Sequence, residues 1–109
     1  MSPPLTGKQL RYLRALGHSK KPVVQIGHGG LAAPVLAAID QALESHELIK
    51  IRVSAEAGTD TDELGEQIGR SARAVVAQVI GRTLLIYRRR KKDPTIVLPK
   101  AGSGRGSEE

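Results

Sequence analysis

The spacing of apolar residues divides most of the chain into helices and strands. Leucines at positions 10, 13 and 16 share one side of a helix, and basic residues recur every third position on another side. Thr6 followed by Gln9 is the capping-box pattern that begins a helix, and Leu5 is placed to pack on Leu10. We therefore predict a first helix that runs to about Leu16 and stops at Gly17.

Two further helices follow from the same periodicity. Apolar residues at 35, 39 and 43 are spaced by four and predict a helix over 32–46, with Pro34 tolerated because it falls in the first turn. Residues 60–63, Asp-Thr-Asp-Glu, predict the beginning of a third helix, whose buried stripe consists of Leu64, Ile68 and Ala72. Acidic side chains of the second helix are expected to face water.

Extended segments lie between and after these helices. Strands are predicted at Val23–Ile26, Leu48–Val53, Val75–Ile80 and Thr83–Tyr87, with a short edge strand at Ile96–Leu98. The alternation in the second strand indicates one packed and one wet face, and Gly81-Arg82 suits a two-residue hairpin. The prediction is a single compact α/β domain, α-β-α-β-α-β-β, with helices packed on a four-stranded mixed sheet. Its first two strands are parallel and its last two antiparallel.

A loop almost without side chains, Gly27-His28-Gly29-Gly30, connects the first strand to the second helix. Glycines permit positive φ and close approach of another backbone, while the following helix offers unpaired N–H groups and the positive end of its dipole. The pattern therefore predicts an anion site, and phosphate is the anion that we expect.

The distribution of charged residues indicates which kind of molecule would carry that phosphate. The 109 residues carry a net charge of +6, and the basic residues gather before residue 39 and over 70–92, whereas acids gather over 40–66. We expect a cationic face built from both ends of the domain and an acidic face opposite, with solvated helix faces as the less favoured alternative. Since Tyr12 and Tyr87 are the only aromatic residues, a nucleic acid would be bound through backbone and charge rather than base stacking.

Other classes of protein find less support. Cysteine is absent, no apolar run reaches about 18 residues, and Met1 leads directly into a polar helix, so we expect a soluble cytoplasmic protein. The domain is expected over 1–99, and 100–109 has the composition of a flexible Gly/Ser tail. No nucleophile has a base partner and no histidine has metal-ligand spacing, which predicts no catalytic residue, metal, cofactor or small-molecule substrate.

One competing motif remains. Residues 27–32 also match the dinucleotide pattern G-x-G-x-x-A, with Glu56 as a conceivable ribose ligand. Glu56 comes later than the roughly 20 residues that this pattern expects, and the second nucleotide-binding half is missing. His28 has two interpretations, a phosphate contact or an exposed turn residue. His18 and His46 are expected at helix ends.

Four linked segments resemble the YhbY family of stand-alone CRM domains: Leu5–Gln9, Lys21–Leu31, Ala42–Lys50 and Gln78–Arg88. The similarity extends over about residues 5–99. It implies a fold like the C-terminal domain of bacterial translation initiation factor three. It also implies an RNA-binding role in maturation of the large ribosomal subunit, with the G-x-x-G loop and an adjacent basic surface as the contact.

The resemblance assigns the loop positions, and the charge pattern adds basic residues to them. The candidate RNA-binding residues are Gly27, His28, Gly29, Gly30, Lys20, Lys21, Lys8, Arg11, Arg14, Arg88, Arg89 and Arg90. The hypothesis is a monomer that binds ribosomal RNA in a precursor of the large subunit, without catalysis and without a membrane. The alternatives are a structural or protein-interaction module on the ribosome and a small nucleotide-binding protein.

Overall fold

The computed structural model describes residues 5–58 and 60–99. Helices and strands alternate along them in the order α1 (Gly7–Gly17), β1 (Pro22–Ile26), α2 (Ala33–His46), β2 (Leu48–Val53), η1 (Ala55–Ala57), α3 (Thr61–Ala72), β3 (Val75–Ile80) and β4 (Thr83–Tyr87). The predicted order of helices and strands is confirmed, and η1, a single turn of 3₁₀ helix, is added to it. The predicted capping box is also present, because Thr6 and Gln9 exchange hydrogen bonds at the beginning of α1.

The strands form one mixed sheet in the order β1-β2-β4-β3. β1 lies parallel to β2, β2 antiparallel to β4, and β4 antiparallel to β3, as the connections predicted. The β3–β4 hairpin turns at Gly81, whose φ is +55°. β1 and β3 are therefore the two edges of the sheet.

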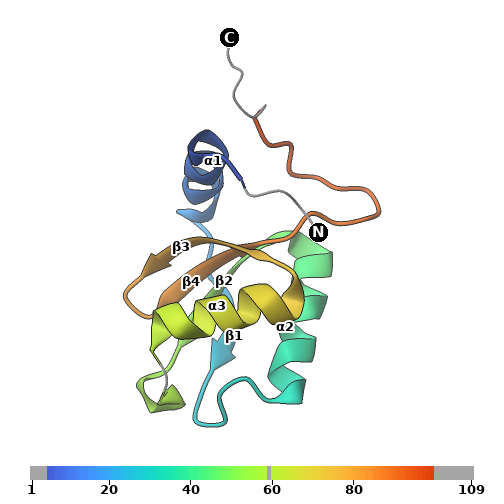
Figure 1. Cartoon of the computed structure of the whole chain (residues 1–109). Coiled ribbons are helices and arrows are strands. Elements are labelled where there is room, and N and C mark those ends of the chain that lie inside the picture. The colour runs from blue at the N-terminus through green and yellow to red at the C-terminus, as the bar shows by residue number, and fades with distance from the viewer. Residues whose placement is uncertain (1–4, 59, 100–109) are drawn as a thin grey trace.

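Helices α2 and α3 cover one face of the sheet (Figure 1). The main core lies between them and the strands, and fully buried Ile39, Ile68 and Ile86 belong to it. The helical spacing of apolar residues in α2 and α3 and the alternation in the strands bring these side chains to the same layer.

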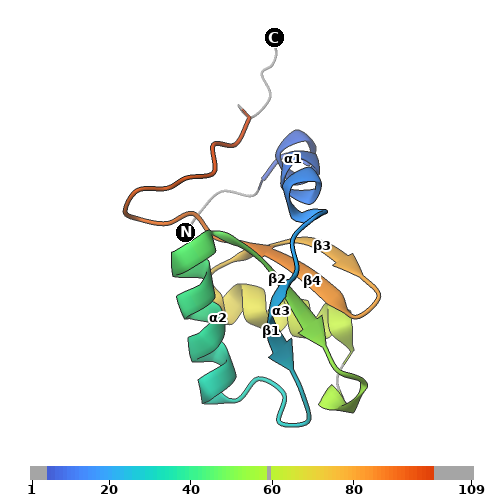
Figure 2. The ribbon, with the colours of Figure 1, turned by 180° about the vertical axis from the view of Figure 1, so that it is seen from behind.

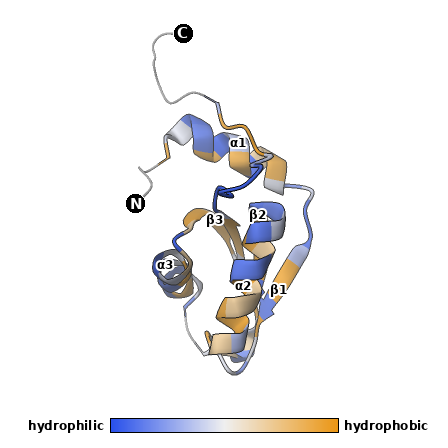
Figure 3. Ribbon diagram, turned by 90° about the vertical axis from the view of Figure 1, so that its right-hand side faces the viewer, coloured by the Kyte–Doolittle hydropathy of each residue, from blue (hydrophilic) through white to orange (hydrophobic). Residues whose placement is uncertain are grey.

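The opposite face is covered only in part, by α1 (Figures 2 and 3). Leu13 of α1 packs there with Leu48 and Tyr87. Gly17 lies so close to the sheet that a Cβ on it would come 2.6 Å from Cδ1 of Leu85. The second strand was expected to have one wet face, and this is wrong for Leu48, because a helix distant in sequence covers that end of the strand.

The predicted edge strand at Ile96–Leu98 is wrong. This segment has no strand pairing, and instead Ile96 and Leu98 pack against the cluster beneath α1. Gln9 of α1 donates a hydrogen bond to the carbonyl of Pro99 at 3.0 Å. The chain after β4 is thus held by α1 rather than by a sheet edge, and the predicted tail at 100–109 lies outside the described residues.

Candidate nucleic-acid interface

The glycine loop connects the end of β1 to the beginning of α2 and closes as a tight turn. The amide of Gly30 donates to the carbonyl of Gly27 at 3.0 Å, and Gly30 has φ +64°. Within this loop only Gly30 has the left-handed backbone that we expected the glycines to provide. The other two glycines therefore need a different explanation.

Packing does not supply that explanation. A Cβ built on Gly27, Gly29 or Gly30 would meet no atom within 4 Å. Since neither space nor φ requires glycine at 27 and 29, the fold itself would accept a larger residue there. What the glycines do provide is bare main chain, which lets another molecule approach closely.

The loop also presents free donors. Among residues 5–58 and 60–99, the amides of His28, Gly29 and Leu31 donate no hydrogen bond to another backbone group. α2 begins at Ala33 without a side-chain cap, so its positive dipole end faces the loop uncompensated. Pro34 has no N–H, and the amides of Val35 and Leu36 donate to the carbonyl of Ala32, so most donors available at this junction are in the loop.

The predicted cations do not surround this loop. Lys20 and Lys21 precede β1, and the loop follows it, so about 20 Å of extended chain separates Lys21 from Gly27. Figures 1 and 2 show α1 and the end of β4 at the same distant end of the molecule. The expected basic surface adjacent to the loop therefore does not include the α1 cations or Lys20-Lys21, because a strand places its two ends far apart. Their contact with RNA stays a prediction.

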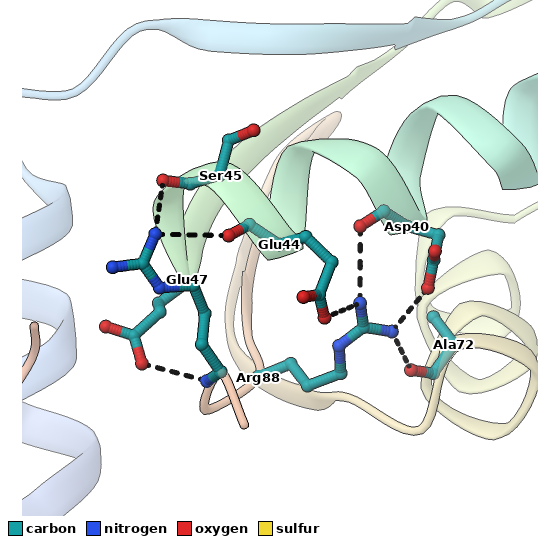
Figure 4. Close-up of polar contacts among 7 residues, drawn as sticks. Asp40, Glu44, Ser45, Glu47, Ala72 and Arg88 are labelled. Atoms are coloured by element: carbon teal, nitrogen blue, oxygen red, sulfur yellow. Dashed lines mark hydrogen bonds and ion pairs between the residues drawn. The ribbon is translucent and has the colours of Figure 1, made fainter. Parts of the chain in front are cut away.

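Arg88 has an internal role that the sequence did not suggest (Figure 4). Its guanidinium pairs with the carboxylates of Asp40 at 2.7 Å and Glu44 at 3.0 Å, and donates to the carbonyl of Ala72 at 2.9 Å. Only 18% of its side chain is exposed. The predicted separation into a cationic face and an opposite acidic face fails here, since basic and acidic segments are neighbours. RNA contact by Arg88 stays a prediction.

Arg90 and Arg14 are likewise bonded within the protein. Arg90 donates to the carbonyls of Glu44, Ser45 and Asp93, where it caps the end of α2. Arg14 donates through Nε to the carbonyl of Ala77 on the β3 edge at 3.0 Å. Within residues 5–58 and 60–99, five of the candidate cations are exposed and have no such bond: Lys8, Arg11, Lys20, Lys21 and Arg89. All of them lie at the α1 end.

A buried acid, Glu47, joins α2 to β2 and was not anticipated as a functional or structural residue. It is fully buried, with φ +64°, and its carboxylate accepts hydrogen bonds from the amides of Arg90, Thr95 and Ile96 and from the Thr95 hydroxyl, at 2.7–2.9 Å. Burial alone would raise the pKa of Glu47, but these hydrogen bonds outweigh it and lower the pKa to about 2. Glu47 thereby holds the segment after β4 in place.

Two arginines at the loop end of the sheet are not among the predicted candidates. Arg52 of β2 is paired in register with Gln25 of β1, and the carbonyl of Arg82 accepts the amide of Val53 at 2.7 Å. Both arginine side chains are exposed at the loop end of the sheet. The alternation of Lys50 and Arg52 on the polar side of the second strand was the signal that could have identified Arg52.

The nucleotide-binding alternative gains no support. Glu56, the conceivable ribose ligand, lies on η1 and accepts a hydrogen bond from the Ser54 hydroxyl, which lowers its pKa, with a smaller contribution from Arg82. After β2 the described chain continues into α3 and a hairpin rather than a second parallel unit.

No helix in the described ranges is both long and apolar enough to span a bilayer.

The fold and the site together define a small α/β domain with a bare G-x-x-G turn at the end of an edge strand. Residues 5–88 match the CRS1/YhbY (CRM) domain. The chain belongs to this family, as the resemblance indicated.

Individual relatives cover nearly the whole domain. The chain is 37% identical over 95 residues to the "Probable RNA-binding protein YqeI" of Bacillus subtilis, which spans 87% of this chain and 99% of the relative. It is 41% identical over 97 residues to an "RNA-binding protein" of Haemophilus influenzae, spanning 88% and 96% of the two chains. A Staphylococcus aureus protein solved in solution, described as a candidate RNA-binding protein, is 43% identical with a TM-score of 0.75. That match covers 88% of this chain and all of the other.

Proposed function

We propose that this protein binds RNA and that the Gly27–Gly30 loop contacts the phosphate backbone through its amides. The observation that carries the proposal is the bare turn itself, whose glycines at 27 and 29 are required neither by φ nor by packing. The free amides of His28 and Gly29 are the donors that an anion needs, and the positive dipole end of α2 adds to their attraction. The relatives named as RNA-binding proteins support RNA as the source of that anion.

The finer proposal concerns the RNA and its setting. By resemblance to the YhbY family, the target is structured ribosomal RNA in a cytoplasmic precursor of the large subunit. The protein acts there as a monomer that aids assembly without catalysis. The net charge of +6 supports a polyanionic partner, and the scarcity of aromatic residues favours contacts with phosphate over stacking.

The loop is tested by placing negative charge where phosphate would lie. We expect Gly29→Asp together with Gly30→Asp to weaken binding of a large-subunit ribosomal RNA transcript at least tenfold, because two carboxylates repel the phosphate that the amides attract. Fluorescence anisotropy measures the affinity, and circular dichroism checks the fold. Gly58→Asp is the matched control, since Gly58 also has positive φ (+74°) and open surroundings.

Equal affinity of the loop variant and the wild type, with both folded, would remove the loop from the RNA contact. Association with ribosomal precursors is tested separately, by sedimenting cell extract and locating the protein among the particles. Presence only on finished subunits would contradict a role in assembly and favour a structural module.

A further inference from the structure

Part of one sheet face has no helix over it (Figure 2). α1 reaches as far as Leu85, where Gly17 packs directly on the strand. Beyond that point one row crosses all four strands in register, formed by Gln25, Arg52, Thr83 and Ile80. Gln25 and Arg52 are exposed, and Ile80 is 62% exposed. The open area borders the glycine loop, which begins two residues after Gln25.

The β1–β2 side of this open face connects the loop to the distant basic end. Pro22 of β1 is paired in register with Lys50 across a β-bulge at Val23, which is 53% exposed, and alternation along β2 places Lys50 on the same face as Arg52. Lys50 donates to the carbonyl of His18 at the end of α1, at 3.4 Å, and its side chain is still half-exposed. Successive positions on this face are about 7 Å apart, so polar groups continue from the loop towards Lys21.

The other face of the sheet offers the opposite charge. α3 carries the exposed acids Asp62, Glu63 and Glu66 and one exposed arginine, Arg70, whereas Asp40 and Glu44 of α2 are paired with Arg88. A polyanion would be repelled there, and α2 and α3 also keep it from the strands. The open face is therefore the surface along which one chain could reach both the loop and the lysines before β1.

We propose that RNA lies along the β1–β2 side of the open sheet face, with Arg52 and Lys50 contacting phosphates between the glycine loop and Lys20-Lys21. This inference rests on the proposed RNA binding. The face has cations and an amide but no aromatic ring, so it takes a phosphodiester backbone rather than stacked bases. We call this path along β1 and β2 the track. One RNA chain on the track would contact both the loop and the cations about 20 Å away from it.

Arg52→Gln is the decisive variant, and Arg70→Gln is its control. Arg70 is an exposed arginine of α3, so its replacement removes the same charge from the covered face. Removing one phosphate contact should lower the slope of log affinity against log salt by about 0.7 for single strands or 0.9 for duplex, which is a roughly five- to eightfold loss of affinity at about 0.1 M salt. We expect this loss for Arg52→Gln and a much smaller change for Arg70→Gln, measured by anisotropy with the ribosomal transcript.

The outcomes separate this inference from the proposed function. If the loop variant weakens binding while Arg52→Gln behaves like Arg70→Gln, the track is wrong and the loop contact stands. If Arg52→Gln weakens binding while the loop variant does not, RNA uses the sheet and the loop proposal fails. If all variants bind like the wild type, both fail. Sedimentation equilibrium that shows a dimer broken by Ile80→Ser would assign the open face to a second copy and overturn the track.

Discussion

Glu47 gives the sharpest test of what holds the domain together. Its buried carboxylate accepts four hydrogen bonds from the segment after β4, and its own carbonyl accepts the amide of Arg88 at 2.9 Å. Glu47→Gln keeps the size of the side chain but replaces one oxygen by an NH₂ group. Whichever way the amide is turned, a donor then faces a donor, at Arg90 or at Thr95 and Ile96.

Two routes give the magnitude of the effect. The pKa of Glu47 falls from 4.5 to about 2, and about 2.5 pKa units correspond to about 3 kcal/mol of stability when the carboxylate is charged. Losing one hydrogen bond to a charged group and leaving a buried donor unpaired costs about 2–4 kcal/mol. We therefore expect Glu47→Gln to destabilise the protein by about 3 kcal/mol, or about 12–24 °C in Tm for a domain of this size.

The pH dependence gives an independent check. Because the folded pKa is depressed, the stabilisation is fully present above about pH 4.5 and is lost as pH falls towards 2. Urea unfolding followed by circular dichroism between pH 7 and pH 2 should show this loss in the wild type. In Glu47→Gln the corresponding part of the pH dependence should be missing.

Glu66→Gln is the matched control, since Glu66 is exposed on α3 and should change stability by no more than about 0.5 kcal/mol. Hydrogen exchange at the amides of Thr95 and Ile96 reports the same contact locally, and both should exchange faster in Glu47→Gln. If Glu47→Gln unfolds at the same urea concentration as Glu66→Gln and keeps the wild-type pH profile, the carboxylate does not fix the segment, and the reasoning is refuted.

Two further variants test the packing of α1 and the role of Arg88. Gly17→Ala should destabilise the domain by about 1–2 kcal/mol, because the new Cβ would overlap buried Leu85. An unchanged urea concentration at the unfolding midpoint would show that α1 can shift away from the sheet without cost. Arg88→Gln should cost about 1–2 kcal/mol, whereas Arg89→Gln should leave stability unchanged. The slope of log RNA affinity against log salt tests the predicted RNA contact of Arg88, and a slope unchanged in Arg88→Gln would contradict it.

Local patterns predicted most of the fold. The capping pair Thr6 and Gln9, the four-residue spacing in α2 and the alternation in β2 act over a few residues, so they can be identified in a sequence without any tertiary information. The segment at Ile96–Leu98 has the composition of a strand, but its amide at Ile96 donates to Glu47 and its apolar side chains pack against the cluster beneath α1. These contacts replace strand pairing. They involve residues about 50 and 90 positions away, which local patterns do not contain.

The candidate site was predicted less well, because charge along a sequence does not say which end of a strand it occupies. Lys20 and Lys21 are close to the loop in sequence but lie across the length of β1 from it. Arg88 was grouped with free cations, although α2 places Asp40 and Glu44 around it. The exposed main chain of the loop could be predicted, because three of its four residues are glycines, which lack a side chain in any fold.

The aromatic residues restrict how such a surface could bind. Tyr87 is buried under α1, where burial raises its pKa, so it has no face to offer a base. Tyr12 on α1 is the other aromatic residue of the chain, and a single ring 39% exposed is no stacking platform. On the proposed binding surface, the energy of binding would come mainly from phosphate contacts, at the loop amides and at cations such as Arg52. Phosphates are common to every sequence, so the shape of the RNA, rather than its bases, would determine where the protein binds.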